Sequence, residues 1–377
     1  MTAVQPTGLY QNRYRYRTRP HDGRKSNLAL VTQSLYDEPQ LTRADLARLT
    51  GLTKVTISDI VSELIDEGLI QETGITTGLR PGKPAATLDV REDTFDIMAI
   101  DLSGSETLRA GLYSIRGAKR TEISMDLQGS TGEDATAITV DLARKCAEQS
   151  TRPILGIGVG SPGTVDAFGT VIAAPNLGWH GVPLQDIISA GLNLPTVVQN
   201  DANTAAIAEK AFADGEATIL RVQISRGVGA GILLSGSLVL GTSGAAGEIG
   251  HVVIDRQGAV CSCGKRGCLE TWISVPSLRR RLAQGPDGHD EILAEAGRRL
   301  GMALAPIVAA LDLQDIVLGG PEDLLDGAFI AACVGLITER THSEFRRDPS
   351  MKLSSLGDEA VLLGAVSLVL RTTLGVS

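Results

Sequence analysis

The feature that most constrains this chain is the stretch EIGHVVIDRQGAVCSCGKRGCLE at residues 248–270. An acid begins it and another ends it. Its four potential metal ligands are His251, Cys261, Cys263 and Cys268. A metal bound by all four would hold the intervening loop closed. At this point three interpretations are open: a structural zinc site, a catalytic metal site, or a coincidence of spacing.

Length and composition describe a globular chain. The 377 residues are enough for two or three domains, and 43% are hydrophobic while 21% are charged. No apolar run reaches the length of a membrane span, and the N-terminus lacks the apolar core of a secretory signal. We therefore expect a cytoplasmic protein with no membrane partner. Because that compartment is reducing, three cysteines close together favour a metal site over disulfides.

The charge of the chain is unevenly distributed. The net charge is −9, yet residues 1–90 hold 11 Lys and Arg against 10 Asp and Glu. A basic N-terminal part on an acidic body is typical of a protein whose N-terminal domain contacts the phosphates of a nucleic acid. We interpret residues 1–25 as a flexible basic arm. The stretch RYRYRTR within it fits phosphate contact and an ordinary solvated tail equally well.

Residues 26–90 carry the pattern of a winged helix-turn-helix. We expect a first helix after a Ser26 cap, a second capped by Thr42, and a third that follows a turn at Gly51 and ends at Gly68. The apolar stripe of the third helix consists of Ile57, Ile60, Val61, Leu64 and Ile65. The residues after it read as strand, loop and strand.

Two groups of residues in this domain have side chains that are suited to contacts with DNA. The third helix begins with short or basic side chains that can approach base edges or phosphate, namely Thr53, Lys54, Thr56 and Ser58. The loop between the two strands carries Arg80 and Lys83, which suit a wing that touches the DNA backbone. The alternative is a three-helix packing module that binds no DNA.

From residue 91 the chain repeats a unit of strand, glycine-rich turn and strand, followed by helices. This repetition predicts an α/β fold with two similar lobes. Turns at residues 103–105 and 225–229 suit nucleotide phosphates, because glycine lets backbone N–H groups approach an anion. The last helix, within GDEAVLLGAVSLVL at 357–370, is expected to be amphipathic.

Several motifs in this body occur together and in a fixed order. They are SPGTVD (161–166), APNLGW (174–179), QNDANTAAIAE (199–209), GEIGH (247–251), CSCGKRGCLE (261–270) and IVLGG (316–320). On these motifs, residues 95–370 resemble the ROK family, which has the two-lobed sugar kinase/actin-like ATPase fold. With the N-terminal winged helix, the whole chain resembles the ROK transcriptional repressors. We therefore divide the chain into the arm, a DNA-binding domain over 26–90 and a sugar-binding body over 91–377.

The resemblance decides among the metal interpretations. One histidine and three cysteines fill a tetrahedral site and leave no position for water, so we expect one structural zinc per chain. The zinc would fix the His251 ring, whose other nitrogen then points toward a sugar. In the family the sugar site is implied to contain Gly163, Asn176, Asn200, Asp201, Glu248, His251 and Glu270. In the kinases the residue matching Asp201 is the general base.

The phosphate loops depart from the kinase pattern. The first reads Asp101-Leu-Ser-Gly-Ser where the family has Asp-x-Gly-Gly-Thr, and the second begins with Ser225 and Arg226. A Cβ where backbone must approach phosphate is unfavourable, although Arg226 could attract phosphate instead. We therefore expect a repressor that responds to a monosaccharide or a sugar phosphate, that is not an enzyme, and that acts on double-stranded DNA as a homodimer or homotetramer.

Two alternatives stay open. One is an active ATP- and Mg²⁺-dependent sugar kinase with an appended DNA-binding domain. The other is a DNA-binding protein that uses its ROK body only for assembly.

Overall fold

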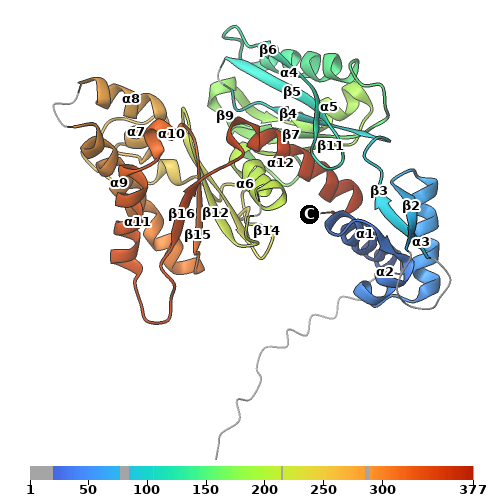
Figure 1. Cartoon of the computed structure of the whole chain (residues 1–377). Coiled ribbons are helices and arrows are strands. Elements are labelled where there is room, and N and C mark those ends of the chain that lie inside the picture. Colours follow the sequence, from blue (N-terminus) through green and yellow to red (C-terminus); the bar gives the residue numbers. More distant parts are fainter. Residues whose placement is uncertain (1–19, 77–84, 105, 214, 285–287, 377) are drawn as a thin grey trace, which may run out of the picture. The chain divides into compact units, whose positions relative to one another are not determined.

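A computed structural model describes residues 20–76, 85–104, 106–213, 215–284 and 288–376 (Figure 1). The chain forms two compact units that divide between Val90 and Arg91, and residues 374–376 belong to the first. None of the helices in the described ranges has both the length and the apolar character needed to cross a membrane.

The first unit contains three helices and a small antiparallel sheet of strand order β1-β3-β2. Its elements are α1 (Pro20–Asp37), β1 (Leu41–Thr42), α2 (Arg43–Thr50), α3 (Lys54–Asp66), β2 (Ile70–Thr76) and β3 (Ala85–Val90). The predicted order of three helices and two strands is confirmed. The predicted wing loop, with Arg80 and Lys83, lies outside the described residues.

Local sequence explains where these helices begin and end. Thr42 and Asp45 form the expected capping box at α2, and Gly51 follows that helix with a φ of 72°, which glycine adopts without strain. The apolar stripe of α3 is buried at four positions, beginning with Ile57. One prediction is wrong: α1 begins at Pro20, not after Ser26, so residues 20–25 of the expected arm are helical. A proline fits the first turn because a helix start has no use for its missing N–H.

The second unit contains two five-stranded sheets (Figure 1). The first has the order β11-β7-β4-β5-β6 and the second the order β14-β13-β12-β15-β16. The strands of the first are β4 (Asp96–Asp101), β5 (Thr107–Tyr113), β6 (Lys119–Asp126), β7 (Ile154–Ser161) and β11 (Thr196–Asn200). Those of the second are β12 (Ile219–Ile224), β13 (Val228–Leu234), β14 (Ser237–Leu238), β15 (Asp315–Gly319) and β16 (Ser350–Leu353).

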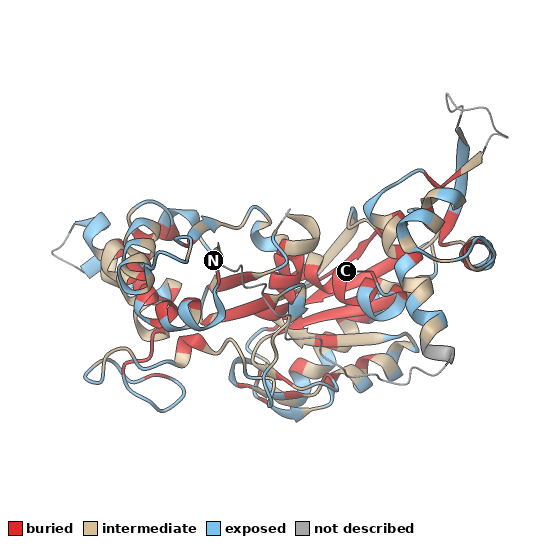
Figure 2. Cartoon of the chain, turned by 90° about the horizontal axis from the view of Figure 1, so that it is seen from below, coloured by how far each residue is buried: buried red, intermediate tan, exposed pale blue. Residues whose placement is uncertain are grey.

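Both sheets follow the same path. Three consecutive strands pair antiparallel, and two later strands then add in parallel beside the first of them. The predicted pair of similar α/β lobes is therefore confirmed. Helices α4 (Gly132–Ala147) and α5 (Leu184–Leu192) pack beside the first sheet, whereas α9 (His289–Leu311) and α11 (Ala328–Thr341) share a hydrophobic core with the second. Buried residues follow the strands of both sheets (Figure 2).

Two helices connect the lobes. Helix α12 (Ala360–Val369) packs on β4 and β7 of the first sheet, α6 (Asp201–Phe212) packs on β12 and β13 of the second, and the two helices contact each other. Glycines permit this close approach. A Cβ at Gly364 would lie 1.9 Å from the carbonyl oxygen of Thr204, and one at Gly158 would lie 2.0 Å from that of Ala365.

The expectation that this last helix is amphipathic is wrong. Almost every residue of α12 is buried, including Ser367 with 3% of its surface exposed. The physical reason is that α12 lies between a sheet on one side and a helix on the other, so it has no solvent-facing stripe.

Candidate functional site

The four potential metal ligands lie together in one loop. The ligand atoms of His251, Cys261, Cys263 and Cys268 all lie within 4.8 Å of one another. His251 belongs to the short helix η2 (Ile249–His251), and the cysteines lie on the loop before α7 (Glu270–Ile273). All four residues are thus brought to one point, as the sequence spacing predicts.

The backbone of this loop turns sharply because of its glycines. The N–H of Cys261 donates to the carbonyl of Lys265 at 2.8 Å, and Gly264 between them has a φ of 86°. Gly267 has a φ of 71°, and a Cβ there would lie 1.4 Å from the carbonyl oxygen of Asp255. A side chain would strain the backbone at both positions, and at Gly267 it would also clash with Asp255.

The spacing of the ligand atoms fits a tetrahedral metal. Zinc bonds of about 2.3 Å to sulfur and about 2.0 Å to nitrogen place neighbouring ligand atoms roughly 3.5–3.8 Å apart. The Nδ1 of His251 lies 3.6 Å from the Sγ of Cys261, and the Sγ atoms of Cys263 and Cys268 are also 3.6 Å apart. Because Nδ1 faces the sulfur, Nε2 is the nitrogen left for another partner.

A cavity of about 670 Å³ opens beside this loop. It is lined by Gly163, Thr164, Ala173, Pro175, Glu248, His251, Val252, Val253 and Lys265. Three of these were proposed from the sequence as sugar-site residues: Gly163, Glu248 and His251. The residue Lys265 was not, although it donates to the carbonyl oxygen of His251 at 2.9 Å.

The other proposed sugar-site residues surround this cavity. The side-chain amide of Asn200 donates to the carbonyl oxygen of Gly163 and to the Oδ1 of Asp201, both at 2.9 Å. Asn200 also caps α6 by accepting from the N–H of Asn203 at 3.0 Å. Asn176 is exposed on the turn η1 (Pro175–Leu177), next to a lining proline.

Glu270 contacts the second proposed phosphate loop. It is the first residue of α7, and its Oε2 accepts from the N–H of Val228 at 3.3 Å. Its Oε1 lies 3.8 Å from the Sγ of Cys261, so the carboxylate lies directly against the metal ligands.

Two of these carboxyl groups have perturbed acidities. Burial raises the pKa of Asp201 to about 7; the N–H of Ala202 opposes this rise, while the charges of Asp101 and Glu248 add to it. Burial also raises the pKa of Glu248, with Glu270 adding to the effect and His251 opposing it. Several acids therefore share one poorly solvated region.

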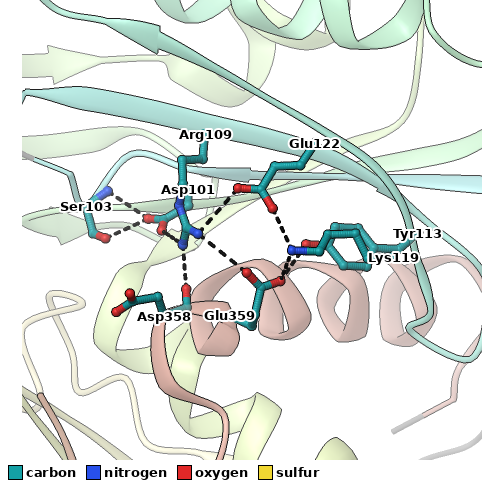
Figure 3. Close-up of polar contacts among 8 residues, drawn as sticks. All are labelled: Asp101, Ser103, Arg109, Tyr113, Lys119, Glu122, Asp358 and Glu359. Carbon is teal, nitrogen blue, oxygen red and sulfur yellow. Dashed lines mark hydrogen bonds and ion pairs between the residues drawn. The ribbon is translucent and has the colours of Figure 1, made fainter.

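An arginine contacts the acid of the first proposed phosphate loop (Figure 3). Arg109 lies directly opposite Asp101 in the pairing of β4 with β5, and its Nη2 is 2.9 Å from the Oδ2 of Asp101. The Oδ1 of the same carboxylate accepts from the N–H and the hydroxyl of Ser103, at 2.9 and 2.6 Å. Both oxygens of Asp101 are therefore engaged within the chain.

This arginine belongs to a larger charge network (Figure 3). Arg109 also donates to the carbonyl of Asp358 and lies 3.5 Å from both Glu122 and Glu359. Lys119 contacts the same two glutamates, at 2.7 and 3.1 Å. The network connects strands β5 and β6 to the short helix η3 (Gly357–Glu359), which precedes α12.

The second proposed phosphate loop is a tight turn between β12 and β13. The N–H of Ser225 donates to the carbonyl of Gly227 at 2.9 Å, while Ser225 and Arg226 are exposed. A Cβ at Gly227 would lie 2.9 Å from the Oε2 of Glu270, so this glycine lets the acid approach the backbone.

The proposed DNA-contacting residues at the start of α3 fall into two groups: those that cap the helix and those that are exposed without a capping role. Thr53 is the N-cap: its hydroxyl accepts from the N–H of Thr56 at 3.2 Å and lies 2.9 Å from the Thr56 hydroxyl. Lys54 and Ser58 are exposed and free of this capping role. Val55 was not singled out from the sequence, yet 71% of its surface is exposed between them.

Sequence comparison identifies the body. A profile of the ROK family matches residues 98–372. The chain belongs to the ROK family. A second profile, of the Crp-like helix-turn-helix domain, matches residues 28–80. This ROK chain thus carries a helix-turn-helix domain ahead of its body.

The relatives of this ROK chain include regulators and kinases. A xylose repressor of Caldicellulosiruptor bescii is 30% identical over 92% of this chain and 96% of its own. The DNA-binding transcriptional dual regulator NagC of Escherichia coli is 26% identical over 92% of this chain and 93% of its own.

The similar solved structures also include both regulators and kinases. A ROK family transcriptional regulator, a homologue of the E. coli MLC protein, matches with a TM-score of 0.82 and 25% identity over 93% of this chain and 96% of its own. A Streptomyces griseus ROK glucokinase in complex with glucose and AMPPNP matches with a TM-score of 0.62 and 25% identity, over 72% of this chain and 98% of its own. The two-lobed sugar kinase/actin-like ATPase fold expected from the sequence is confirmed.

Proposed function

We propose that this ROK protein is a sugar-responsive transcriptional regulator, a repressor whose affinity for operator DNA changes when a monosaccharide or a derivative binds. One observation carries the proposal: a helix-turn-helix domain with an exposed α3 face stands in the same chain as a cavity whose lining includes Glu248 and His251. The relatives support it, because a xylose repressor and NagC align with nearly the whole chain.

The cavity has the groups that sugar hydroxyls require. Ionised carboxylates such as Glu248 and Glu270 can each accept hydrogen bonds from two neighbouring hydroxyls. Asp201 accepts or donates according to its protonation, and Asn200 holds the carbonyl of Gly163 in place beside it. We propose that these residues, with Asn176 and His251, bind the effector. Xylose, glucose and N-acetylglucosamine are all polyhydroxyl ligands of the required chemistry.

We propose one structural zinc ion per chain, held by His251, Cys261, Cys263 and Cys268. The donor set fits, because thiolates and imidazole are the ligands that zinc prefers, and four of them fill its tetrahedral shell. When bound, the metal supplies no reactive position. It braces the loop and fixes the tautomer of His251, so that Nε2 is available as a hydrogen-bond partner for the sugar.

DNA recognition is proposed for the first unit. Lys54 and Ser58 are exposed at the start of α3, and Thr53 and Thr56 stabilise that end of the helix. Arg80 and Lys83 of the wing loop are proposed phosphate contacts. Two copies of the domain in a homodimer or homotetramer would read a two-fold symmetric operator in successive major grooves.

The sugar is proposed to act by changing the preferred arrangement of the lobes. A shift from a 99:1 to a 1:99 population requires about 5.5 kcal/mol of differential sugar affinity. Hydrogen bonds from residues of both lobes, summed over the subunits of an oligomer, supply energies of this order because each charged hydrogen bond contributes about 1.5–3 kcal/mol.

We further propose that the protein does not phosphorylate its sugar. Arg109 and Ser103 engage both oxygens of Asp101, so the first phosphate loop has no free carboxylate for a Mg²⁺–nucleotide. In the second loop, Ser225 and Arg226 stand where the kinase pattern has a glycine and a threonine. The competing proposal, an active sugar kinase, is favoured by Asp201, because an acid with a pKa of about 7 suits a general base.

A gel-shift titration of the full-length protein with a library-selected operator, with and without each sugar, tests the regulatory proposal. We expect one sugar to weaken binding, whereas a response to none would support the assembly-only alternative. A coupled ADP-release assay with ATP, Mg²⁺ and the same sugars tests the second proposal; sustained turnover would establish the kinase.

A further inference from the structure

Helix α3 presents an uncovered stripe opposite its buried one. Residues Val55, Ser58, Asp59 and Ser62 are all exposed, and their spacing places them on one face of the helix. The buried residues Ile57, Ile60, Val61 and Leu64 form the opposite face. An apolar side chain, Val55, lies in the first turn of this stripe, and the described residues of the first unit leave 71% of its surface exposed.

The stripe also contains an acid without a partner. Elsewhere in the first unit, Asp45 lies 2.8 Å from Arg48, and Glu72 lies 2.9 Å from Arg43. Among the described residues, no hydrogen bond or ion pair engages the carboxylate of Asp59. An unpaired carboxylate on a surface that faces DNA is repelled by the phosphates. Such a residue therefore favours DNA binding only where a hydrogen-bond donor on the DNA contacts it.

The major groove offers few such donors. A carboxylate accepts hydrogen bonds and donates none. The base edges of the groove carry acceptors on guanine and on thymine, and the donors are the amino groups N4 of cytosine and N6 of adenine. An aspartate one turn into a recognition helix is therefore attracted by these amino groups and repelled by guanine and thymine at the same position.

We propose, resting on the DNA-binding function argued above, that Asp59 is a specificity-determining residue that accepts a hydrogen bond from a base amino group, of cytosine or adenine, in each half-site. The contact selects which base occupies one position of the half-site, and it does not increase the affinity for non-specific DNA. The exposed Val55 stands one turn earlier on the same stripe, where an apolar contact with the methyl group of thymine is available.

The test is selection from a randomised DNA pool by the full-length protein, for the wild type and for Asp59→Ala, Asp59→Asn and Asp66→Asn. Asp66 is the matched control, because it is an exposed acid two turns further along the same face of α3. We expect a wild-type preference of about five-fold or more for cytosine or adenine at one half-site position. Asp59→Ala should erase it, Asp59→Asn should select adenine whichever of the two bases the wild type prefers, and Asp66→Asn should keep the wild-type preference.

The outcomes separate this proposal from the function on which it rests. If the wild type enriches no sequence, DNA recognition itself is refuted. If it enriches a sequence that Asp59→Ala selects unchanged, only the role of Asp59 is overturned. Equal changes with Asp59→Asn and Asp66→Asn would show a general charge effect and would also overturn it. If the preferred base is cytosine the contact is to N4, and if adenine it is to N6.

Discussion

Replacing Arg109 by glutamine should destabilise the second unit strongly. The substitution removes the cation that faces Asp101 and leaves that carboxylate, whose side chain is only 7% exposed, without a counter-charge. It also removes the donor to the carbonyl of Asp358, which connects β5 to the segment before α12. The perturbation thus acts where the first lobe is attached to the helix shared by both lobes.

The size of the effect follows from burial. Removing one partner of a buried ion pair costs about 3–5 kcal/mol. Asp101 keeps two hydrogen bonds from Ser103, and the side chain of Arg109 is 24% exposed, so we expect about 3 kcal/mol. The contacts with Glu122 and Glu359 are longer, at 3.5 Å, and their loss adds little. At about 2 °C per kcal/mol, the melting temperature should fall by roughly 6 °C.

The assay is thermal unfolding followed by tryptophan fluorescence. The chain has two tryptophans, Trp179 and Trp272, and both belong to the second unit, so the signal excludes the DNA-binding unit. The control is Lys145→Gln, which removes a cation from an exposed pair and should cost below about 0.5 kcal/mol. The double variant Asp101→Asn/Arg109→Gln should recover most of the loss. A single variant as stable as the control, or a double variant less stable than the single, would refute the reasoning.

Three further predictions concern the sugar site, the metal and the helix shared by the lobes. Because the pKa of Asp201 is raised to about 7, the folded state keeps a proton that the unfolded chain has lost, so stability should fall as the pH rises from about 4 to 7. Sugar affinity, measured by calorimetry, should show the opposite trend and weaken below pH 7. The variant Asp201→Asn should flatten both pH profiles. Elemental analysis should find one zinc per chain, and Cys263→Ser or a strong chelator should remove it, lower the melting temperature and abolish stabilisation by sugar. The variant Gly364→Val should lower the unfolding temperature of the second unit, because the new side chain would clash with the backbone of Thr204. The control Gly335→Ala has open space around its Cβ and should have little effect in the same thermal-unfolding experiment.

The sequence predicted features that depend on local pattern. The capping residue Thr42, the turn at Gly51 and the repeated strands follow from rules that act over a few residues, and the motif spacing predicted that His251 would meet the cysteines. These outcomes needed no knowledge of which strands pair.

Features that depend on long-range pairing were missed. Arg109 lies 249 residues from Asp358, and nothing in the sequence around either residue shows that they meet. Lys265 reaches the cavity only through the fold of the metal loop. The burial of α12 did have a sequence signal, because VLLGAVSLVL is apolar on every face, and such a helix is buried on all sides.

The two halves of the kinase-like site have separate structural bases in this protein. Phosphate binding depends on a loop of the first sheet, where Asp101 is held by a strand neighbour and by Ser103. The proposed sugar site includes Asp201, Glu248 and Glu270, and burial together with like charges raises the pKa of Asp201 and Glu248 there. Protonation relieves part of the cost of holding these carboxylates together, and hydrogen bonds from sugar hydroxyls would relieve more of it. We therefore propose that this chain has lost phosphate transfer at Asp101 and Arg109 while its cavity still binds a sugar, which is the combination a regulator needs.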